Sequence, residues 1–223
     1  MKNKTIIFTI LVFTIIQCSS NKKQEDKCKI NNEKSARCQV EYFLTDDISY
    51  LDSALYYINE VFDDCEQYKL LLVLGMRKLV IYSTIKEYTK AIYFVDTLCK
   101  KEIISQFYKN VLTNRFNAMN AQYKGDTVSK KIYIQQAFNE VEQLFLSCKE
   151  ELYSFLQKPY ETIYEYDKII LPVQYYYYKV QIEGIDKVKA EVDSLQKAIS
   201  GDEQYFDLIR QMLEEDLMSF SGI

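Results

Sequence analysis

Four segments of the chain repeat one spacing, and this repeat is the feature that most constrains the fold. Each begins with a small or β-branched residue, followed by Ile or Val four positions later and by Leu or Val seven positions later. Residues at these intervals lie on one face of a helix. Consecutive copies are far enough apart for a second helix between them, so the repeat predicts stacked pairs of antiparallel helices. The segments are Ala54–Val61, Ala91–Leu98, Ala137–Leu144 and Val188–Leu195.

The scarcity of turn-forming residues favours an all-α fold. Only 5 glycines and 2 prolines occur in 223 residues, and these are the residues that most often interrupt helices. Second helices are expected over 67–85, 103–123 and 173–182. Pro172 suits the first turn of the last of these, Gly125 and Gly184 suit helix ends, and Asp202 can cap a final helix.

The best copy of the repeat has the order aromatic, short turn, aromatic, Ala. It reads Tyr82, Lys86-Glu87, Tyr88, Ala91-Ile92 and Leu98. This pattern resembles the tetratricopeptide (TPR) repeat, a helix–turn–helix unit. The resemblance implies a right-handed solenoid of antiparallel helix pairs over residues 45–223. The alternative is an ordinary up-and-down helical domain.

The first residues describe a secretory leader. Lys2 and Lys4 precede an apolar run over Ile6–Ile16, which ends at Gln17 and Cys18. The run is too short to span a bilayer, which takes about 20 apolar residues, although an uncleaved anchor is the competing interpretation. The segment resembles a bacterial lipoprotein signal. That resemblance implies removal of residues 1–17 and attachment of lipid, including palmitate, to Cys18.

The segment that follows the leader is expected to be a flexible tether. Residues 18–44 are rich in Lys, Asn, Glu and Gln and have almost no apolar periodicity, so they bury too little surface to order themselves. Ser19 follows Cys18, as in the pattern that sends lipoproteins to the outer membrane. The expected arrangement is therefore a domain of residues 45–223 held at the cell envelope by an N-terminal lipid.

The remaining cysteines are consistent with an oxidising compartment. Cys28 and Cys38 share the expected tether, which makes them the preferred disulfide pair, whereas Cys65, Cys99 and Cys148 are interpreted as buried free thiols. A zinc site is the alternative, but the chain has no C-x-x-C motif and no histidine to complete one.

Neither the motifs nor the charge indicate catalysis or nucleic-acid binding. The absence of histidine removes the usual general base and the commonest metal ligand. Two S-x-x-K matches, Ser83–Lys86 and Ser194–Lys197, lack the companion motifs of penicillin-recognising enzymes. The net charge is −4, with no basic block for phosphates. We therefore expect no enzyme activity, no cofactor, no metal and no nucleic-acid partner.

Tyrosines give the strongest indication of a binding surface. The run Tyr175–Tyr178 turns through about 300° on a helix, so its rings cannot all face one core, and at least one should lie on the surface or against a neighbouring helix. Packing between repeats is the alternative to a partner-binding patch. Tyr175, Tyr177 and Tyr178 are the first candidates for partner contacts, followed by Tyr82 and Tyr123. The sequence thus favours a non-catalytic protein- or peptide-binding lipoprotein. An immunity lipoprotein against an envelope-targeted toxin and an accessory in glycan or nutrient capture are the alternatives.

Overall fold

The computed structural model describes residues 24–158 and 166–213, and every regular element in these ranges is an α-helix. The all-α prediction is therefore confirmed for this part of the chain. No helix in these ranges is both long and apolar enough to cross a bilayer. The expected leader and Cys18 lie outside the described residues. The described residues fall into two compact units, one within residues 1–105 and one within residues 106–223.

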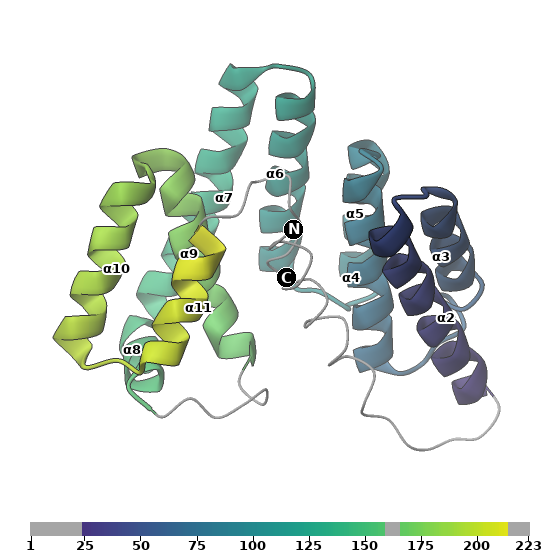
Figure 1. Ribbon diagram of the computed structural model, residues 1–223, viewed down its shortest axis with the longest axis horizontal. Coiled ribbons are helices and arrows are strands. Elements are labelled where there is room, and N and C mark those ends of the chain that lie inside the picture. Colours follow the sequence, from purple (N-terminus) through teal and green to yellow (C-terminus); the bar gives the residue numbers. More distant parts are fainter. Residues whose placement is uncertain (1–23, 159–165, 214–223) are drawn as a thin grey trace. The chain divides into compact units, whose positions relative to one another are not determined.

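The first unit contains two helical hairpins (Figure 1). Helix α2 packs against α3 and α4, and α4 packs against α5. The connection between α4 and α5 is the short turn predicted from the repeat, in which Lys86 adopts a left-handed conformation with φ of 62°. The helices are α2 (Gln24–Thr45), α3 (Ser49–Asn59), α4 (Tyr68–Thr84) and α5 (Tyr88–Lys100).

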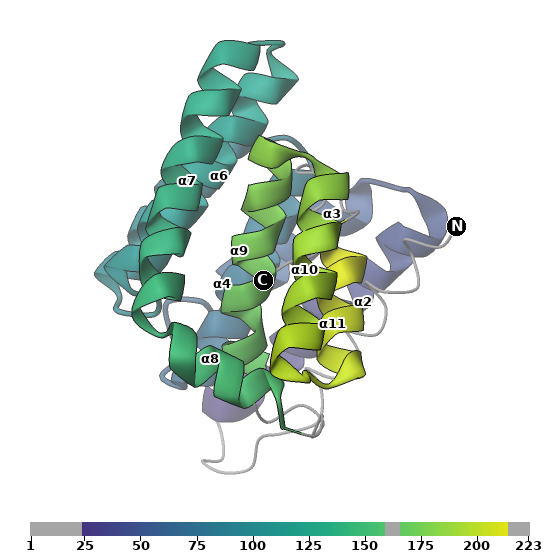
Figure 2. The same ribbon diagram turned by 90° about the vertical axis from the view of Figure 1, so that its left-hand side faces the viewer.

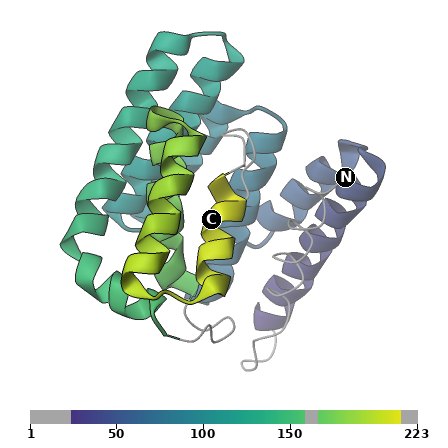
Figure 3. The ribbon, with the colours of Figure 1, turned by 60° about the vertical axis from the view of Figure 1, so that its left-hand side comes forward.

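The second unit is built around α9. This helix contacts α7, α8, α10 and α11, so side chains on several of its faces meet neighbouring helices. Helices α6 and α7 form a long hairpin (teal in Figures 1 and 3), and Figure 2 shows α9 beside α10. The helices are α6 (Gln106–Tyr123), α7 (Thr127–Ser147), α8 (Lys149–Leu156), α9 (Tyr166–Glu183), α10 (Ile185–Ile199) and α11 (Glu203–Leu213).

The repeated spacing does mark the buried face of four helices. Its first two positions are fully buried in every copy, at 0% exposure. The third position is buried as Val61 and Leu98 in the first unit, but Leu144 is 37% exposed. The predicted face is therefore confirmed at two positions of the repeat and only partly at the third. The eight fully buried residues are Ala54, Ile58, Ala91, Val95, Ala137, Val141, Val188 and Val192.

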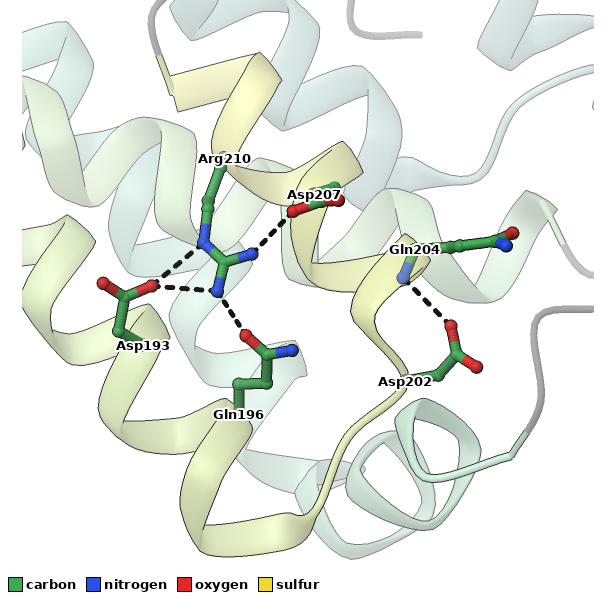
Figure 4. A network of polar contacts seen from close by, with 6 residues as sticks. All are labelled: Asp193, Gln196, Asp202, Gln204, Asp207 and Arg210. Carbon is green, nitrogen blue, oxygen red and sulfur yellow. Dashed lines mark hydrogen bonds and ion pairs between the residues drawn. The ribbon is translucent and has the colours of Figure 1, made fainter.

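Several helix ends lie where the sequence placed them. Gly125 and Gly184 both have positive φ, 75° and 90°, between consecutive helices, a conformation that glycine adopts without strain. The Asp202 carboxylate accepts a hydrogen bond of 2.9 Å from the backbone N–H of Gln204 at the start of α11 (Figure 4). The expected position of Pro172 is wrong. Helix α9 begins at Tyr166, so Pro172 lies inside the helix and not in its first turn.

Arg210 joins the last two helices. Its guanidinium bonds Asp193 and Gln196 on α10 and Asp207 on its own helix α11 (Figure 4). The contacts to Asp193 and Asp207 measure 2.9 and 2.8 Å. Since both carboxylates are about half exposed, this network orients α11 more than it stabilises the fold.

The expected flexible tether is wrong for most of its length, because residues 24–45 form α2. Its buried face is largely polar. Cys28, Asn32, Ser35 and Gln39 recur at helical spacing and are all buried. Since this face carries amides and a hydroxyl in place of aliphatic side chains, the sequence shows no apolar periodicity that would predict the helix.

The expected Cys28–Cys38 disulfide is also wrong. Cys28 bonds to Cys65, which follows α3, with the two Cα atoms 5.9 Å apart, and Cys38 is a free thiol. The helical conformation of α2 explains the difference. Ten residues along a helix rise about 15 Å, whereas a disulfide needs Cα atoms within about 7 Å. The bond fastens α2 to the segment after α3.

Candidate functional site

The tyrosine cluster proposed from the sequence is part of the core. Tyr175, Tyr177 and Tyr178 are 7%, 5% and 1% exposed, so they do not form a surface for a partner. The ring of Tyr175 stacks on Phe145 of α7, with centroids 4.1 Å apart. All four consecutive rings are buried because α9 has neighbours on several sides, so the packing alternative holds and the partner-binding patch does not.

Burial also fixes the ionisation state of these phenols. Loss of hydration raises the pKa of Tyr176 and of Tyr178 above the ordinary value, with the charge of Arg115 opposing the shift at Tyr178. The pKa of Tyr175 is raised by the same cause, against a hydrogen bond from Lys179. The phenols therefore remain neutral over the physiological range and act as packing groups.

The two lower-ranked tyrosines have different surroundings. Tyr123 is 59% exposed at the end of α6. Tyr82, on α4, lines a groove of the first unit. The structure therefore separates the five candidates, with three in the core, one on the open surface of α6 and one in a groove.

The groove is the candidate functional site. Its volume is about 720 Å³, within the range of ligand-binding pockets. Side chains of α4 and α5 form two of its walls, and the end of α3 with the residues after it forms another. Tyr93 is 75% exposed at this site, while the next residue, Phe94, is buried at 6% exposure. The lining residues are Asn59, Phe62, Asp63, Lys78, Tyr82, Thr89, Lys90, Tyr93, Phe94 and Thr97.

Lys78 is the residue with the most unusual surroundings in the groove. Its ammonium lies 4.3 Å from the ring centroid of Phe94, and at 5.9 and 5.8 Å from those of Phe62 and Tyr82. It also donates a hydrogen bond of 2.7 Å to Oδ1 of Asn59. Helix α4 supplies both Lys78 and Tyr82, one helical turn apart. Three aromatic rings from three segments therefore surround one cation.

The charges around the groove leave Lys78 without an anionic partner. Asp63 is ion-paired with Lys101 at 2.9 Å, and Lys90 is ion-paired with Glu87 at 3.1 Å. No carboxylate of the described residues lies within ion-pair distance of the Lys78 ammonium. Burial lowers the pKa of Lys78 below its ordinary value, and the charge of Asp63 opposes this shift. The lysine is thus a half-buried cation without an ion-pair partner among the residues that the structure describes.

Arg77, the residue before Lys78, holds α4 in place through contacts with α2. This buried guanidinium donates to the Asn32 backbone oxygen at 2.9 Å and to Ser35 Oγ at 2.8 Å, both on α2. A further bond goes to the side-chain oxygen of Asn32. Burial lowers the pKa of Arg77 to about 10, so it is still charged at neutral pH. Arg77 therefore ties α4 to the polar face of α2.

The disulfide fixes the remaining wall. Phe62 and Asp63 lie just before Cys65, whose bond to Cys28 fastens this segment to α2. The backbone N–H of Cys65 also bonds to the carbonyl of Val61 at 3.0 Å, which closes a tight turn around Phe62 and Asp63. The groove thus has a wall held by a covalent bond and a helix held by a buried arginine.

Sequence reasoning found one residue of this site and missed its centre. Tyr82 was proposed, but Lys78, Phe62 and Phe94 were not. The available signal was Lys78 four residues before Tyr82 on one helix, a spacing that places the two side chains together. That signal is common on helix surfaces, and the contributions of Phe62 and Phe94 depend on tertiary contacts.

The polar and aromatic groups of the groove define what it can contact. Among the described residues, no group of three or more cysteine or acidic side chains lies close enough to hold a metal ion. The chemistry that the groove offers is one cation, exposed aromatic surface and hydroxyl groups. No protein-family model, curated protein sequence or solved structure matches this chain.

Proposed function

We propose that the protein is a lipid-anchored, non-catalytic module of the cell envelope that binds a protein or peptide partner in the α4–α5 groove. The observation that carries this proposal is Lys78, a half-buried cation without an ion-pair partner among the described residues, which lines the same groove as the exposed ring of Tyr93. Aromatic rings such as that of Tyr93 are among the groups that contribute most to protein recognition.

The leader and the disulfide support the envelope location. Lys2, Lys4, the apolar run and Cys18 resemble a lipoprotein signal. The disulfide between Cys28 and Cys65 is of the kind that persists in oxidising compartments, outside the cytosol. Because α2 begins at Gln24, a lipid on Cys18 would hold the first unit near the membrane surface. The Ser after Cys18 favours the outer membrane.

We also propose that the helix pairs stack as TPR-like repeats in a right-handed solenoid. Support comes from the two fully buried positions that four helices share and from the turn at Lys86, which lies where the TPR resemblance expects it. Such repeats expose a long surface for a partner and carry out no chemistry themselves.

Photo-cross-linking in intact cells tests the binding proposal. A photoreactive amino acid replaces Tyr93 in one strain and Lys131 in another. Lys131 is an exposed residue of α7 outside the groove. We expect a discrete adduct with one protein from position 93 and none from position 131. Equal adducts from both positions, or none from position 93, would contradict the proposal.

Fatty-acid labelling tests the anchor separately. Cells grown with an alkyne-bearing palmitate should incorporate it into the wild-type protein and not into a Cys18→Ser variant. The wild-type protein should also fractionate with membranes. A label that survives in the variant, or wild-type protein recovered in the cytosol, would remove the anchor from the account.

A further inference from the structure

We propose that the partner inserts an acidic side chain into the groove, where its carboxylate pairs with Lys78 while an adjacent apolar residue packs on Tyr93. This inference rests on the proposed function and specifies the chemistry of its ligand, an acidic peptide segment of a partner protein.

The charge balance of the groove favours an anion. The lining residues and their ion-pair partners comprise the lysines Lys78, Lys90 and Lys101 and the carboxylates Asp63 and Glu87. Two of the lysines are already paired, which leaves one positive charge in excess at Lys78. A ligand carboxylate complements that charge.

Lys78 also has hydrogen-bond donors that the described protein groups do not use. An ammonium has three N–H donors, and in the described structure one donates to Asn59. The aromatic rings stabilise the charge through their faces and offer no oxygen acceptor. A carboxylate in the groove would accept a charge-assisted hydrogen bond, which is about twice as strong as a neutral one.

Other ligand chemistries fit less well. A cationic side chain would meet the uncompensated charge of Lys78, and the ring faces that would attract it already hold the lysine's own ammonium. A purely apolar side chain would remove water from Lys78 and give nothing in return, which is costly for an ion. The exposed ring of Tyr93 and the nearby Thr89 and Thr97 instead provide space for an apolar neighbour of the acidic residue.

Selection from a random peptide library tests this inference. Phage-displayed dodecapeptides are selected on the full-length protein in detergent micelles, and each consensus peptide is synthesised with its acidic residue and with the matching amide. Affinities are then measured for wild type, Lys78→Met, Lys78→Arg and Lys69→Met. Lys69 is an exposed lysine on the same helix, outside the groove, and serves as the matched control.

The expected result is a consensus with Asp or Glu beside an apolar residue. Its affinity should fall about tenfold or more in Lys78→Met and on amide substitution of the peptide, as for loss of a charge-assisted hydrogen bond. It should be largely kept in Lys78→Arg and unchanged in Lys69→Met. Peptides without an acidic position, or acidic peptides insensitive to Lys78→Met, would overturn this inference and leave peptide binding intact. Failure to select any peptide would contradict the proposed function as well.

Discussion

Cys28 and Cys65 join α2 covalently to the segment that forms one wall of the groove. Phe62, which faces the Lys78 ammonium, and Asp63, which pairs with Lys101, lie just before Cys65. This wall of the groove is therefore sensitive to redox conditions, because an oxidising environment preserves the disulfide that attaches it to α2.

Removal of the disulfide should destabilise the first unit. The Cys28→Ala/Cys65→Ala double variant should lose about 2–5 kcal/mol of unfolding free energy, the usual cost of deleting a native disulfide. Denaturant unfolding measures this loss. The control is Cys38→Ala, which removes a free thiol on the same helix α2. A double variant as stable as the control would show that the Cys28–Cys65 bond is not formed.

Arg77 should matter for stability and not for binding. Arg77→Met leaves Asn32 and Ser35 without their buried donor, so we expect a loss of about 2–4 kcal/mol. Arg37→Met, at an exposed position of α2, should change stability by less than about 0.5 kcal/mol. Denaturant unfolding of both variants measures the difference, and similar values for the two would contradict the tie between α2 and α4.

The two groups of tyrosines should respond in opposite ways to truncation. Tyr175→Ala removes a ring stacked on Phe145 in the core, and we expect it to cost about 3–5 kcal/mol. Tyr93→Ala removes an exposed ring and should leave the unfolding free energy within about 0.5 kcal/mol of wild type. Thermal unfolding compares them. A destabilised Tyr93→Ala beside an unaffected Tyr175→Ala would reverse the assignment of core and surface.

Much of the helical framework could be predicted from the sequence, since the determining interactions are local. The repeat marks the buried face because Ala or Val followed by Ile or Val four residues later places both on one side of a helix, and all eight of these residues are fully buried. The turn at Lys86 and the positive φ of Gly125 and Gly184 follow from equally local chemistry.

The misplaced features depend on distant partners. Helix α2 buries the polar side chains of Asn32, Ser35 and Gln39. Their burial is explained by hydrogen bonds from Arg77 to Asn32 and Ser35, and Arg77 lies far along the chain. The Cys28 pairing was wrong for the same reason, since an assumed flexible tether would have allowed Cys38 to reach it. For the tyrosines of α9, the choice between a surface patch and packing between helices stayed open, because the number of helices around α9 cannot be read from its own residues.

High pH should destabilise the second unit. Burial raises the pKa of Tyr176 and Tyr178 above the ordinary 10.0, so the folded protein holds these protons more tightly than the unfolded chain does. The stability they confer is complete below pH 10 and is lost as the pH rises from there toward the folded pKa values, by about 1.4 kcal/mol per pH unit for each group.

Alkaline unfolding followed by phenolate absorbance and circular dichroism measures this dependence. In Tyr176→Phe, the loss of stability with pH above 10 should be shallower than in wild type, whereas Tyr123→Phe, at an exposed position, provides the matched control. An unchanged slope in Tyr176→Phe would contradict the assignment of this phenol as a buried neutral group.

Lys78 should contribute to binding and not to the stability of the fold. Its pKa is lowered because burial disfavours the charged form, so the folded state carries an ion that would be better hydrated in the unfolded chain. Lys78→Met should therefore melt at the same temperature as wild type or higher, a pattern typical of binding-site residues. A clear drop in melting temperature, relative to Lys69→Met, would instead assign Lys78 a structural role.

The most direct test compares two variants for affinity to the protein cross-linked from position 93. Calorimetry with the full-length chain in micelles measures binding of that partner to Lys78→Met, in the groove, and to Tyr175→Phe, in the core of the second unit. The groove account predicts an affinity about tenfold lower for Lys78→Met and unchanged for Tyr175→Phe. Full affinity in Lys78→Met, with a loss in Tyr175→Phe, would contradict it.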